Sequence, residues 1–372
     1  MKKYRFMIVG SGWRSLYYVR IAKALPQYFE LCAMLCRTQE KADYIATVHG
    51  IHTTMSVEEC VKMKPDFVVV AVNKASIADV AKEWLERGFF VLCETPASLE
   101  LKTLHELWAL HEQGAKLAVA EQYIFYPFYY AIGQVLQRKW IGDPYSAVVS
   151  LAHEYHGASL IRHFLREDMT AFQVTGKTFT FPTVETMSRY ERFTDGRIGD
   201  KKRTTAVFEF ADGKVGWYDF DSEQYRSPIR HNYLNIRGPR GEIKDDKIYY
   251  LNQDNLPVST SLAVTKRTIE VPGETNPNLR QIEQITEIGL EDSSVTVYKP
   301  FFGNVPLSSD ETAIANLMYG VAVYAGEKDG SGKLRVPYYS LKNALQDSYM
   351  AILLQQALTT KETVKSTRQP WH

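Results

Sequence analysis

The stretch 6–22 constrains the fold most, because an apolar strand, a glycine turn and a helix follow one another without a gap. Residues 6–9 form a continuous apolar run, as in a parallel strand that is covered on both faces. Gly10 permits a tight turn, and Gly12 lets backbone N–H groups approach a pyrophosphate at the start of the helix. The stretch therefore predicts a dinucleotide fingerprint; the alternative is a glycine-rich turn that binds no ligand.

Nearby residues bear on that fingerprint and on the choice of cofactor. The usual third glycine is Ser15 here, a small residue that still allows close packing of helix and strand. A second strand is predicted at 31–35, and Cys36 follows it where an NAD-preferring fold carries an acid for the ribose 2′-hydroxyl. Arg37 and Thr38 come next, and an arginine beside a hydroxyl suits a 2′-phosphate. NADP is therefore favoured over NAD; the alternative for Arg37 is a solvated strand end.

The first third of the chain continues to alternate between strands and helices. Further apolar strands are predicted at 66–72, 89–93 and 117–120, and an amphipathic helix is predicted at 75–87. Alternation with short links predicts a parallel, doubly wound sheet. We therefore expect an α/β fold with a Rossmann domain over residues 1–122.

The pattern changes after that domain. A strand is predicted at 145–155, a hairpin at 205–220 and a loop rich in Pro and Asn at 272–278. Hydroxyl and acidic residues at 308–311 indicate the start of a helix. The polar tail after Thr359 is expected to be either loose or an oligomer contact.

Charge and composition exclude several classes of partner. The formal net charge is +1, whereas nucleic-acid and anionic-membrane partners usually require a basic excess. No stretch reaches the roughly 20 apolar residues of a spanning helix. The four cysteines lie in apolar surroundings and are interpreted as core residues rather than as a disulfide framework. We expect a cytoplasmic protein without a nucleic-acid or membrane partner.

Several motifs make the chain similar to a known family, the glucose–fructose oxidoreductase and inositol dehydrogenase family (Gfo/Idh/MocA). These motifs stand in family order and span nearly the whole chain: Gly10-Ser11-Gly12, Ala71-Val72-Asn73, Glu94-Thr95-Pro96, Glu121-Gln122-Tyr123, Gly238-Pro239-Arg240-Gly241-Glu242-Ile243 and the closing helix that starts at Leu341.

The resemblance implies a particular architecture and reaction. It implies an α+β substrate and oligomerisation domain with a large, mostly antiparallel open sheet at 123–340, followed by a C-terminal helix and tail at 341–372. It also implies hydride transfer between a nicotinamide and a carbohydrate-like alcohol or ketone, in a homo-oligomer. Together with the fingerprint, it assigns the following cofactor-binding candidates: Gly10, Ser11, Gly12, Trp13, Arg14, Arg37, Thr38, Ala71, Val72, Asn73, Glu94, Thr95 and Gln122.

The catalytic positions depart from the family pattern in two places. Members carry a lysine where this chain has Thr95, and an aspartate four residues before a histidine where it has Ser159. His163 matches the family histidine and is the usual kind of proton carrier at neutral pH; the alternative is a helix histidine satisfied by a backbone carbonyl. Glu121 is a second candidate acid or base. The catalytic candidates are thus His163, Glu121, Thr95 and Ser159.

A metal site is not predicted. His153, Glu154 and His156 lie close in sequence, but on the expected strand the two histidines would point to opposite faces, and the spacing matches no zinc pattern.

Three hypotheses follow from these positions. The first is an NAD(P)-dependent oxidoreductase. The second is a glycoside-cleaving enzyme that retains NAD(P) for a redox-neutral cycle of oxidation and elimination. The third is a non-catalytic dinucleotide-binding protein.

Overall fold

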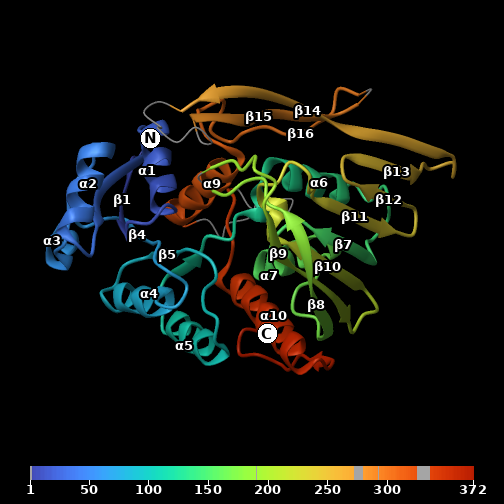
Figure 1. The fold of residues 1–372 in the computed structure, drawn as a ribbon, viewed down its shortest axis with the longest axis horizontal. Coiled ribbons are helices and arrows are strands. Elements are labelled where there is room, and N and C mark those ends of the chain that lie inside the picture. Colours follow the sequence, from blue (N-terminus) through green and yellow to red (C-terminus); the bar gives the residue numbers. More distant parts are fainter. Residues whose placement is uncertain (1, 190, 272–279, 292, 325–335) are drawn as a thin grey trace. The chain divides into compact units, whose positions relative to one another are not determined.

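The fold is that of a computed structural model, which describes residues 2–189, 191–271, 280–291, 293–324 and 336–372 (Figure 1). The chain forms two compact units. The first contains Met1–Tyr126, Phe301–Ser348 and Trp371, and the second contains Pro127–Pro300, Tyr349–Pro370 and His372. A segment near the C-terminus, Phe301–Ser348, therefore belongs with the N-terminal residues.

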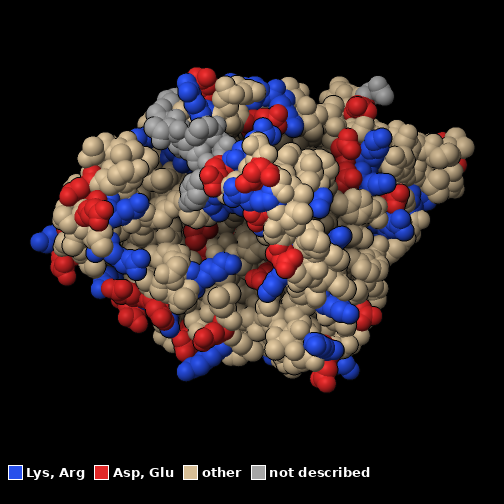
Figure 2. Space-filling view, viewed as in Figure 1, with Lys and Arg blue, Asp and Glu red and all other residues tan. Residues whose placement is uncertain are grey.

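Charged side chains of both signs are interspersed on the face of the molecule in Figure 2, in keeping with the balanced composition. Among the described helices, none combines the length and the apolar character needed to cross a membrane.

The first unit is built on a six-stranded parallel sheet in the order β3-β2-β1-β4-β5-β6 (Figure 1). The chain order reverses at the neighbouring strands β1 and β4, which is the switch point of a doubly wound sheet. The predicted α/β fold is confirmed. The strands are β1 Tyr4–Val9, β2 Phe29–Leu35, β3 Thr53–Thr54, β4 Phe67–Val70, β5 Val91–Cys93 and β6 Leu117–Val119. The helices are α1 Ser15–Ala24, α2 Gln39–His49, α3 Val57–Lys62, α4 Ile77–Glu86, α5 Leu101–Glu112, η1 Tyr123–Phe125 and α9 Ser309–Val323.

Helices α1 and α9 share one apolar core with this sheet. Tyr18 and Ile21 of α1 and Ile314 and Met318 of α9 belong to the same cluster as Ile8 of β1, and all five side chains are fully buried. Burial of a large apolar side chain stabilises a fold by roughly 1.5–3 kcal/mol. Helix α9 is therefore an integral part of the first unit, although it lies far from α1 in sequence.

The second unit is built on a sheet that has 11 strands within the described residues, in the order β16-β15-β14-β13-β12-β11-β7-β10-β9-β8-β17. Strands β7 and β10 pair in parallel, and the other pairs are antiparallel. The expected large, mostly antiparallel sheet is thus confirmed. The strands are β7 Ser146–Ser150, β8 Phe172–Val184, β9 Ile198–Phe210, β10 Val215–Asp221, β11 Tyr233–Gly238, β12 Gly241–Lys244, β13 Lys247–Leu251, β14 Pro257–Glu270, β15 Gln281–Leu290, β16 Thr296–Tyr298 and β17 Val364–Lys365. The helices are α6 Pro127–Gln137, α7 Glu154–Leu165, η2 Ser222–Tyr225 and α10 Leu341–Thr360, whose residues from Tyr349 onward belong to this unit.

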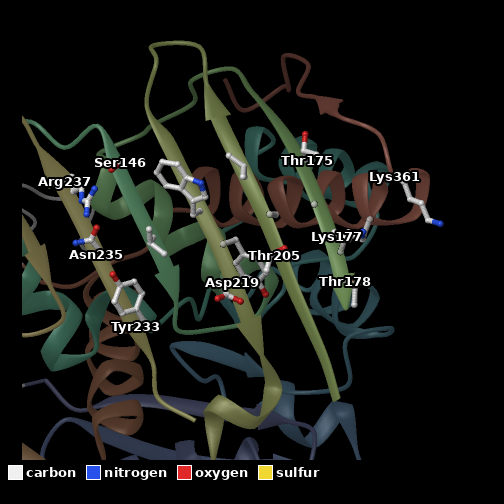
Figure 3. Close-up of a pocket in the computed structure, with 17 residues that line it drawn as sticks. Ser146, Thr175, Lys177, Thr178, Thr205, Asp219, Tyr233, Asn235, Arg237 and Lys361 are labelled. Carbon is white, nitrogen blue, oxygen red and sulfur yellow. The ribbon is translucent and has the colours of Figure 1, made fainter. Parts of the chain in front are cut away.

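The two faces of the central strands β7 to β11 differ in character. Ala147 and Val149 of β7 are fully buried, and α7 packs against β7 and β10. Because side chains alternate along a strand, their neighbours point to the opposite face. There Trp217, Tyr233 and Arg237 help to line a cavity of about 1220 Å³ (Figure 3).

The prediction of a strand at 145–155 is wrong for the second half of this range. Strand β7 ends at Ser150, and α7 begins at Glu154. The only glycine between 145 and 160, Gly157, lies inside α7, and a Cβ there would approach the Tyr218 ring to 2.5 Å. Gly157 thus serves close packing rather than a turn, and no turn residue marks the strand end in the sequence.

The C-terminal tail is packed, so the expectation of a loose tail is wrong. Strand β17 pairs with β8. Trp371 is 2% exposed, and its indole N–H donates to Oε1 of Gln346 at 3.0 Å. The loop predicted at 272–278 lies outside the described residues.

Candidate functional site

The glycine turn lies at the switch point between β1 and β4. Gly10 has φ of +111°, and a Cβ at this position would lie 2.4 Å from the carbonyl oxygen of Ala71. Only glycine fits such a backbone and such an approach. A Cβ at Gly12 would meet no atom within 4 Å, so open space lies beside this backbone. Ser15 is fully buried, and its Oγ donates to the Ala71 carbonyl at 3.4 Å. The turn therefore fits a dinucleotide pyrophosphate: Gly10 allows the backbone to pack against Ala71, and the space beside Gly12 is open.

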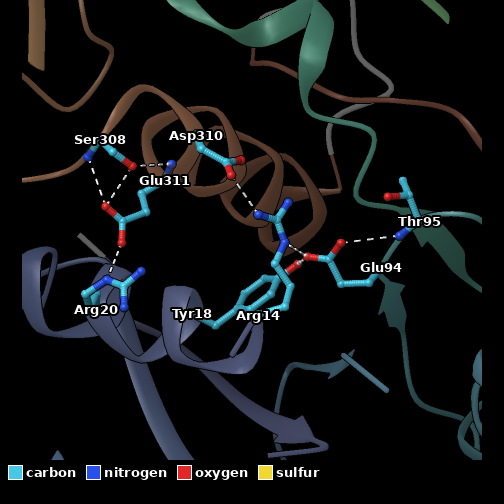
Figure 4. Close-up of polar contacts among 8 residues, drawn as sticks. All are labelled: Arg14, Tyr18, Arg20, Glu94, Thr95, Ser308, Asp310 and Glu311. Carbon is cyan, nitrogen blue, oxygen red and sulfur yellow. Dashed lines mark hydrogen bonds and ion pairs between the residues drawn. The ribbon is translucent and has the colours of Figure 1, made fainter. Parts of the chain in front are cut away.

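Arg14 is the centre of a polar network beside this turn (Figure 4). Its Nε donates to Oε1 of Glu94 at 2.7 Å, and its Nη1 donates to Oδ2 of Asp310 at 2.8 Å. With the amide oxygen of Gln122 turned toward it, Nη2 donates to that oxygen at 2.7 Å. Burial alone would lower the pKa of Arg14, but the charges of Asp310 and Glu94 raise it well above its usual value. Arg14 thus binds two acids and an amide as a permanent cation.

Glu94 is held in one orientation by three donors. Besides Arg14, the hydroxyl of Tyr18 donates to Oε1 at 2.7 Å, and the N–H of Thr95 donates to Oε2 at 3.3 Å. Glu94 is 6% exposed. The peptide bond that follows it, between Thr95 and Pro96, is cis. Burial and the Glu94 charge raise the pKa of Tyr18 well above its usual value, so its hydroxyl remains a donor. The Glu94 carboxylate, at the carboxyl end of β5, is therefore held in place.

Helix α9 contributes the acid that the sequence analysis missed. Ser308 and Glu311 form a capping box, in which the Glu311 N–H donates to Oγ of Ser308 at 3.2 Å and the Ser308 N–H donates to Oε2 of Glu311 at 2.9 Å. Glu311 also forms an ion pair with Arg20 of α1 (Figure 4). The first turn of α9 is thereby fixed, and Asp310 faces Arg14. Its sequence signal was ambiguous, because acids in the first turn are common in any helix.

The end of β2 carries the residues expected to choose between NAD and NADP. Cys36 is 3% exposed; burial raises the pKa of its thiol, against the opposing effect of a hydrogen bond with Ser11. Oγ1 of Thr38 accepts the Lys41 N–H at 3.3 Å and caps α2. Arg37 is exposed, and among the described residues no side chain forms an ion pair with it.

The remaining cofactor candidates occupy the ends of other elements. Oδ1 of Asn73 accepts the N–H groups of Ala75 and Ser76, both at 3.1 Å, so Asn73 shapes the turn before α4. Trp13 is 44% exposed beside the glycine turn. Val72 is half-buried next to Asn73. These residues surround the carboxyl ends of β1 and β4, where ligands bind in doubly wound sheets.

The catalytic candidates are distributed over both units. Thr95 and Glu121 belong to the first unit, and Ser159 and His163 belong to the second. Glu121 is 2% exposed, and its Oε1 accepts the N–H of Tyr123 at 3.2 Å.

Of the two candidates on α7, Ser159 contacts its own helix and His163 faces α6. Oγ of Ser159 donates to the His156 carbonyl at 3.0 Å. The ring of His163 faces α6, because a Cβ at Gly133 would lie 2.8 Å from its Nε2. That nitrogen is buried and has no hydrogen-bond partner among the described residues. Burial and the charge of Arg166 lower the pKa of His163 to about 4, so the ring is neutral at pH 7.

A further group of polar side chains lies where β7 leads into α7; the sequence analysis considered its two histidines only as metal ligands and did not find their contacts with tyrosines. His153 precedes the helix, and its ring contacts the phenol oxygens of Tyr155 and Tyr225. His156 packs against both His153 and Tyr155, with ring centroids at 4.9 and 4.4 Å. The expectation that His153 and His156 lie on opposite faces of a strand is therefore wrong. Within the described residues, no cluster of three or more His, Cys, Asp or Glu side chains could hold a metal ion.

Comparisons with known proteins agree with the fold. The model of an oxidoreductase family with an NAD-binding Rossmann fold (GFO_IDH_MocA) matches residues 4–121. No curated protein matches the chain. An NAD-binding oxidoreductase from Klebsiella pneumoniae has 14% identity and a TM-score of 0.63, with 99% of this chain and 100% of that chain covered.

Two further solved structures are similar over the same extent. An oxidoreductase from Agrobacterium radiobacter in complex with NAD+, L-tartaric acid and magnesium has 14% identity and a TM-score of 0.62, with 98% of both chains covered. A myo-inositol dehydrogenase from Corynebacterium glutamicum has 14% identity and a TM-score of 0.59, with 99% of this chain and 100% of that chain covered. At such identities the likeness shows the fold alone.

Proposed function

We propose that this chain, whose residues 4–121 belong to the Gfo/Idh/MocA oxidoreductase family, is an NAD(P)-dependent oxidoreductase that acts on a carbohydrate-like alcohol or ketone. The observation that carries the proposal is the turn at the switch point, where Gly10 closes onto Ala71 while the space beside Gly12 stays open. A nicotinamide would supply hydride chemistry there. A polyol or sugar-like substrate is supported by the solved structures named as myo-inositol dehydrogenases.

In this proposal, residues of the first unit hold the dinucleotide. The N–H groups of the turn at Gly10, Ser11 and Gly12 would receive the pyrophosphate, as the N-terminus of a helix favours anions. Glu94 and Gln122, both fixed by Arg14, would contact the nicotinamide ribose and carboxamide.

In this proposal, Arg37 determines the preference for NADP over NAD. Its exposed guanidinium, with no ion-pair partner in the described part of the chain, is available for a 2′-phosphate, which supports NADP. Thr38 already caps α2 through the lone pairs of its oxygen, but its hydroxyl proton can still be donated.

The proton step has four candidates, His163, Glu121, Thr95 and Ser159. If His163 carries the proton, the variant His163→Ala will lose turnover while its nucleotide affinity stays within about a few-fold. At pH 7 the ring of His163 is neutral, which is the form that accepts a proton, and a pKa of about 4 makes it a weak base.

We also propose a division of labour along the chain and a setting for the protein. Residues 1–122 bind the dinucleotide. Of the second domain expected at 123–340, the part that lies in the second unit, up to Pro300, binds substrate and forms a homo-oligomer through the open sheet, followed by the C-terminal helix and tail at 341–372. Four free cysteines suit the reducing cytoplasm.

Two alternatives make different predictions. Thr95 and Ser159 replace a lysine and an aspartate of the family pattern, which supports either a retained cofactor in a glycoside-cleaving cycle or a dinucleotide-binding protein without catalysis. An oxidoreductase consumes added cofactor; the glycoside-cleaving enzyme cleaves without net consumption; the binding protein does neither.

The test begins by denaturing the purified protein and identifying any nucleotide that it releases. Calorimetric titration with NAD+ and NADP+ follows, and then absorbance at 340 nm with a panel of inositols, sugars and sugar acids. Reduction of added cofactor by one of these alcohols is the expected result. Stoichiometric release of a nucleotide, together with cleavage of a glycoside and no net reduction, would favour the second hypothesis. Binding of neither nucleotide would overturn the proposal.

A further inference from the structure

We propose that Asp310 makes the nicotinamide end of the candidate site prefer the oxidised, positively charged cofactor over the reduced, neutral one. The proposal rests on the proposed function, in which Glu94 and Gln122 contact the nicotinamide ribose and carboxamide. Asp310 is outside the candidates derived from the sequence, and it lies in the first unit together with these two residues and Arg14. Asp310 touches no reacting atom in this scheme and acts through its charge.

Arg14 connects Asp310 to the two residues assigned to the nicotinamide end. Its Nη1 donates to Oδ2 of Asp310 at 2.8 Å, and its Nε donates to Oε1 of Glu94 at 2.7 Å (Figure 4). With the amide oxygen of Gln122 turned toward it, its Nη2 donates to that oxygen at 2.7 Å. A guanidinium is planar, and its donors have a fixed geometry. The width of one guanidinium therefore separates Asp310 from each of the other two side chains.

The charges of the two acids and Arg14 do not cancel. Arg14 contributes one positive charge, whereas Asp310 and Glu94 contribute two negative charges, and both acids raise the pKa of Arg14. The side chains of Arg14 and Asp310 are 14% and 25% exposed, so solvent screens their charges only in part. A nicotinamide ring is positively charged when oxidised and neutral when reduced. A negative group near the ring therefore stabilises the oxidised form selectively.

The charge of Asp310 is held in one place by further contacts. Burial, the charge of Asp310 and a hydrogen bond with it raise the pKa of Tyr126 well above its usual value, against the opposing charge of Arg14. The phenol of Tyr126 therefore stays protonated and donates to the carboxylate. The capping box of Ser308 and Glu311 fixes the first turn of α9, which carries Asp310. A fixed charge can prefer one form of the cofactor without reorganisation, as in other preorganised sites.

Selective stabilisation of the oxidised form also affects the direction of the reaction. It lowers the reduction potential of the bound cofactor, so that the reduced cofactor becomes a stronger hydride donor. In that direction a hydride passes from the nicotinamide to the carbonyl carbon of a ketone, and the carbonyl oxygen takes up a proton, which gives an alcohol and the oxidised cofactor. The charge of Asp310 therefore favours reduction of a ketone over oxidation of an alcohol at the site.

A purely structural role is the competing interpretation. In that case Asp310 only anchors α9 to Arg14, and its loss weakens the binding of both forms of the cofactor by the same factor. An electrostatic role instead changes the ratio of the two dissociation constants. The two interpretations therefore differ in this ratio, and a change in one affinity alone does not separate them.

The experiment measures dissociation constants for the oxidised and the reduced cofactor by calorimetric titration, with whichever of NAD and NADP the parent binds more tightly. We expect Asp310→Asn to shift their ratio by about fivefold to tenfold against the oxidised form, because one unit of negative charge is lost near a partly buried site. A tenfold shift corresponds to a rise of about 30 mV in the reduction potential of the bound cofactor. Asp310→Glu keeps the charge and should keep the ratio within about twofold of the parent.

Arg14→Gln tests the sign of the effect. This variant removes a positive charge from the same network, so its ratio should shift in favour of the oxidised form, opposite to the shift in Asp310→Asn. A structural defect common to both variants does not produce opposite shifts. If Asp310→Asn does not fold, the direction of the shift in Arg14→Gln decides the question.

Asp66→Asn is the matched control in the same unit. Asp66 precedes β4 at its amino end, where it contacts the Lys2 ammonium and the Arg5 N–H. Because the glycine turn follows the carboxyl end of the parallel strand β1, Asp66 lies at the opposite edge of the sheet. Loss of this carboxylate should leave the ratio of the two dissociation constants unchanged.

Two results would contradict the inference in different ways. An unchanged ratio in folded Asp310→Asn, or a shift of Arg14→Gln in the same direction as Asp310→Asn, would overturn the role of Asp310 and leave the proposed function intact. Failure of the parent to bind either nucleotide would overturn the proposed function, and the inference with it.

Discussion

Alanine at Gly10 should destabilise the first unit without any change in chemistry. A positive φ such as +111° is almost restricted to glycine and costs other residues about 1–3 kcal/mol. The new Cβ would also lie 2.4 Å from the Ala71 carbonyl oxygen and 2.9 Å from its carbon. These are backbone atoms next to β4 and can move only with the strand, so overpacking adds about 1–3 kcal/mol. We expect a loss of about 2–6 kcal/mol, a large share of a typical stability of 5–15 kcal/mol.

The matched variant is Gly12→Ala, which adds the same methyl group two residues away where no atom lies within 4 Å. We expect its free energy of unfolding to stay within about 1 kcal/mol of the parent, and its affinity for NAD(P)+ to fall by about tenfold or more, because the methyl group occupies the space assigned to the pyrophosphate. Urea unfolding followed by fluorescence measures the first quantity, and calorimetric titration measures the second. Gly10→Ala with the stability of the parent would refute the steric reasoning. Gly12→Ala with full nucleotide affinity would refute the placement of the pyrophosphate.

Three further predictions concern charged or titratable side chains. Arg37→Ala should weaken binding of NADP+ more than that of NAD+ in calorimetric titrations; equal losses would remove the argument for a 2′-phosphate. Asp310→Asn removes one of the two acids bound to half-buried Arg14 and should destabilise the first unit by about 1–3 kcal/mol in urea unfolding, whereas an unchanged midpoint would contradict a stabilising role for this network. Because the pKa of His163 is about 4 in the folded protein and about 6.5 when unfolded, the unfolded state binds this proton first as pH falls. The stability contribution is therefore complete above pH 6.5, falls below it and levels off near pH 4; His163→Leu should flatten this part of the stability profile, and an identical slope in the variant would contradict the assignment.

Local signals in the sequence were sufficient for the alternating strands and helices of residues 1–122, but not for the packing of α9 with them. A strand, a turn through Gly10 and a helix are fixed by residues close in the chain, because backbone conformation and short-range packing depend on neighbours. The helix start at Ser308 was predicted for the same reason, since a capping box needs only four consecutive residues. The end of β7 was mispredicted, because no glycine or proline stands between Ser150 and Glu154 to mark it. Gly157 lies inside α7 and packs against the Tyr218 ring, which is 61 residues further along the chain.

The polar contacts of the candidate site were decided by tertiary structure. Arg14 and Asp310 are 296 residues apart in sequence and 2.8 Å apart between their charged atoms, and no local pattern links them. His153 and Tyr225 are likewise 72 residues apart. The sequence by itself determined the glycine turn and the order of strands and helices in residues 1–122, which depend on residue size, periodicity and caps. Only the packing of α9 against α1, and of η2 beside the start of α7, determined which acid, imidazole and phenol meet, because hydrogen bonds require atoms to lie within about 3 Å and sequence spacing does not specify such distances between remote segments.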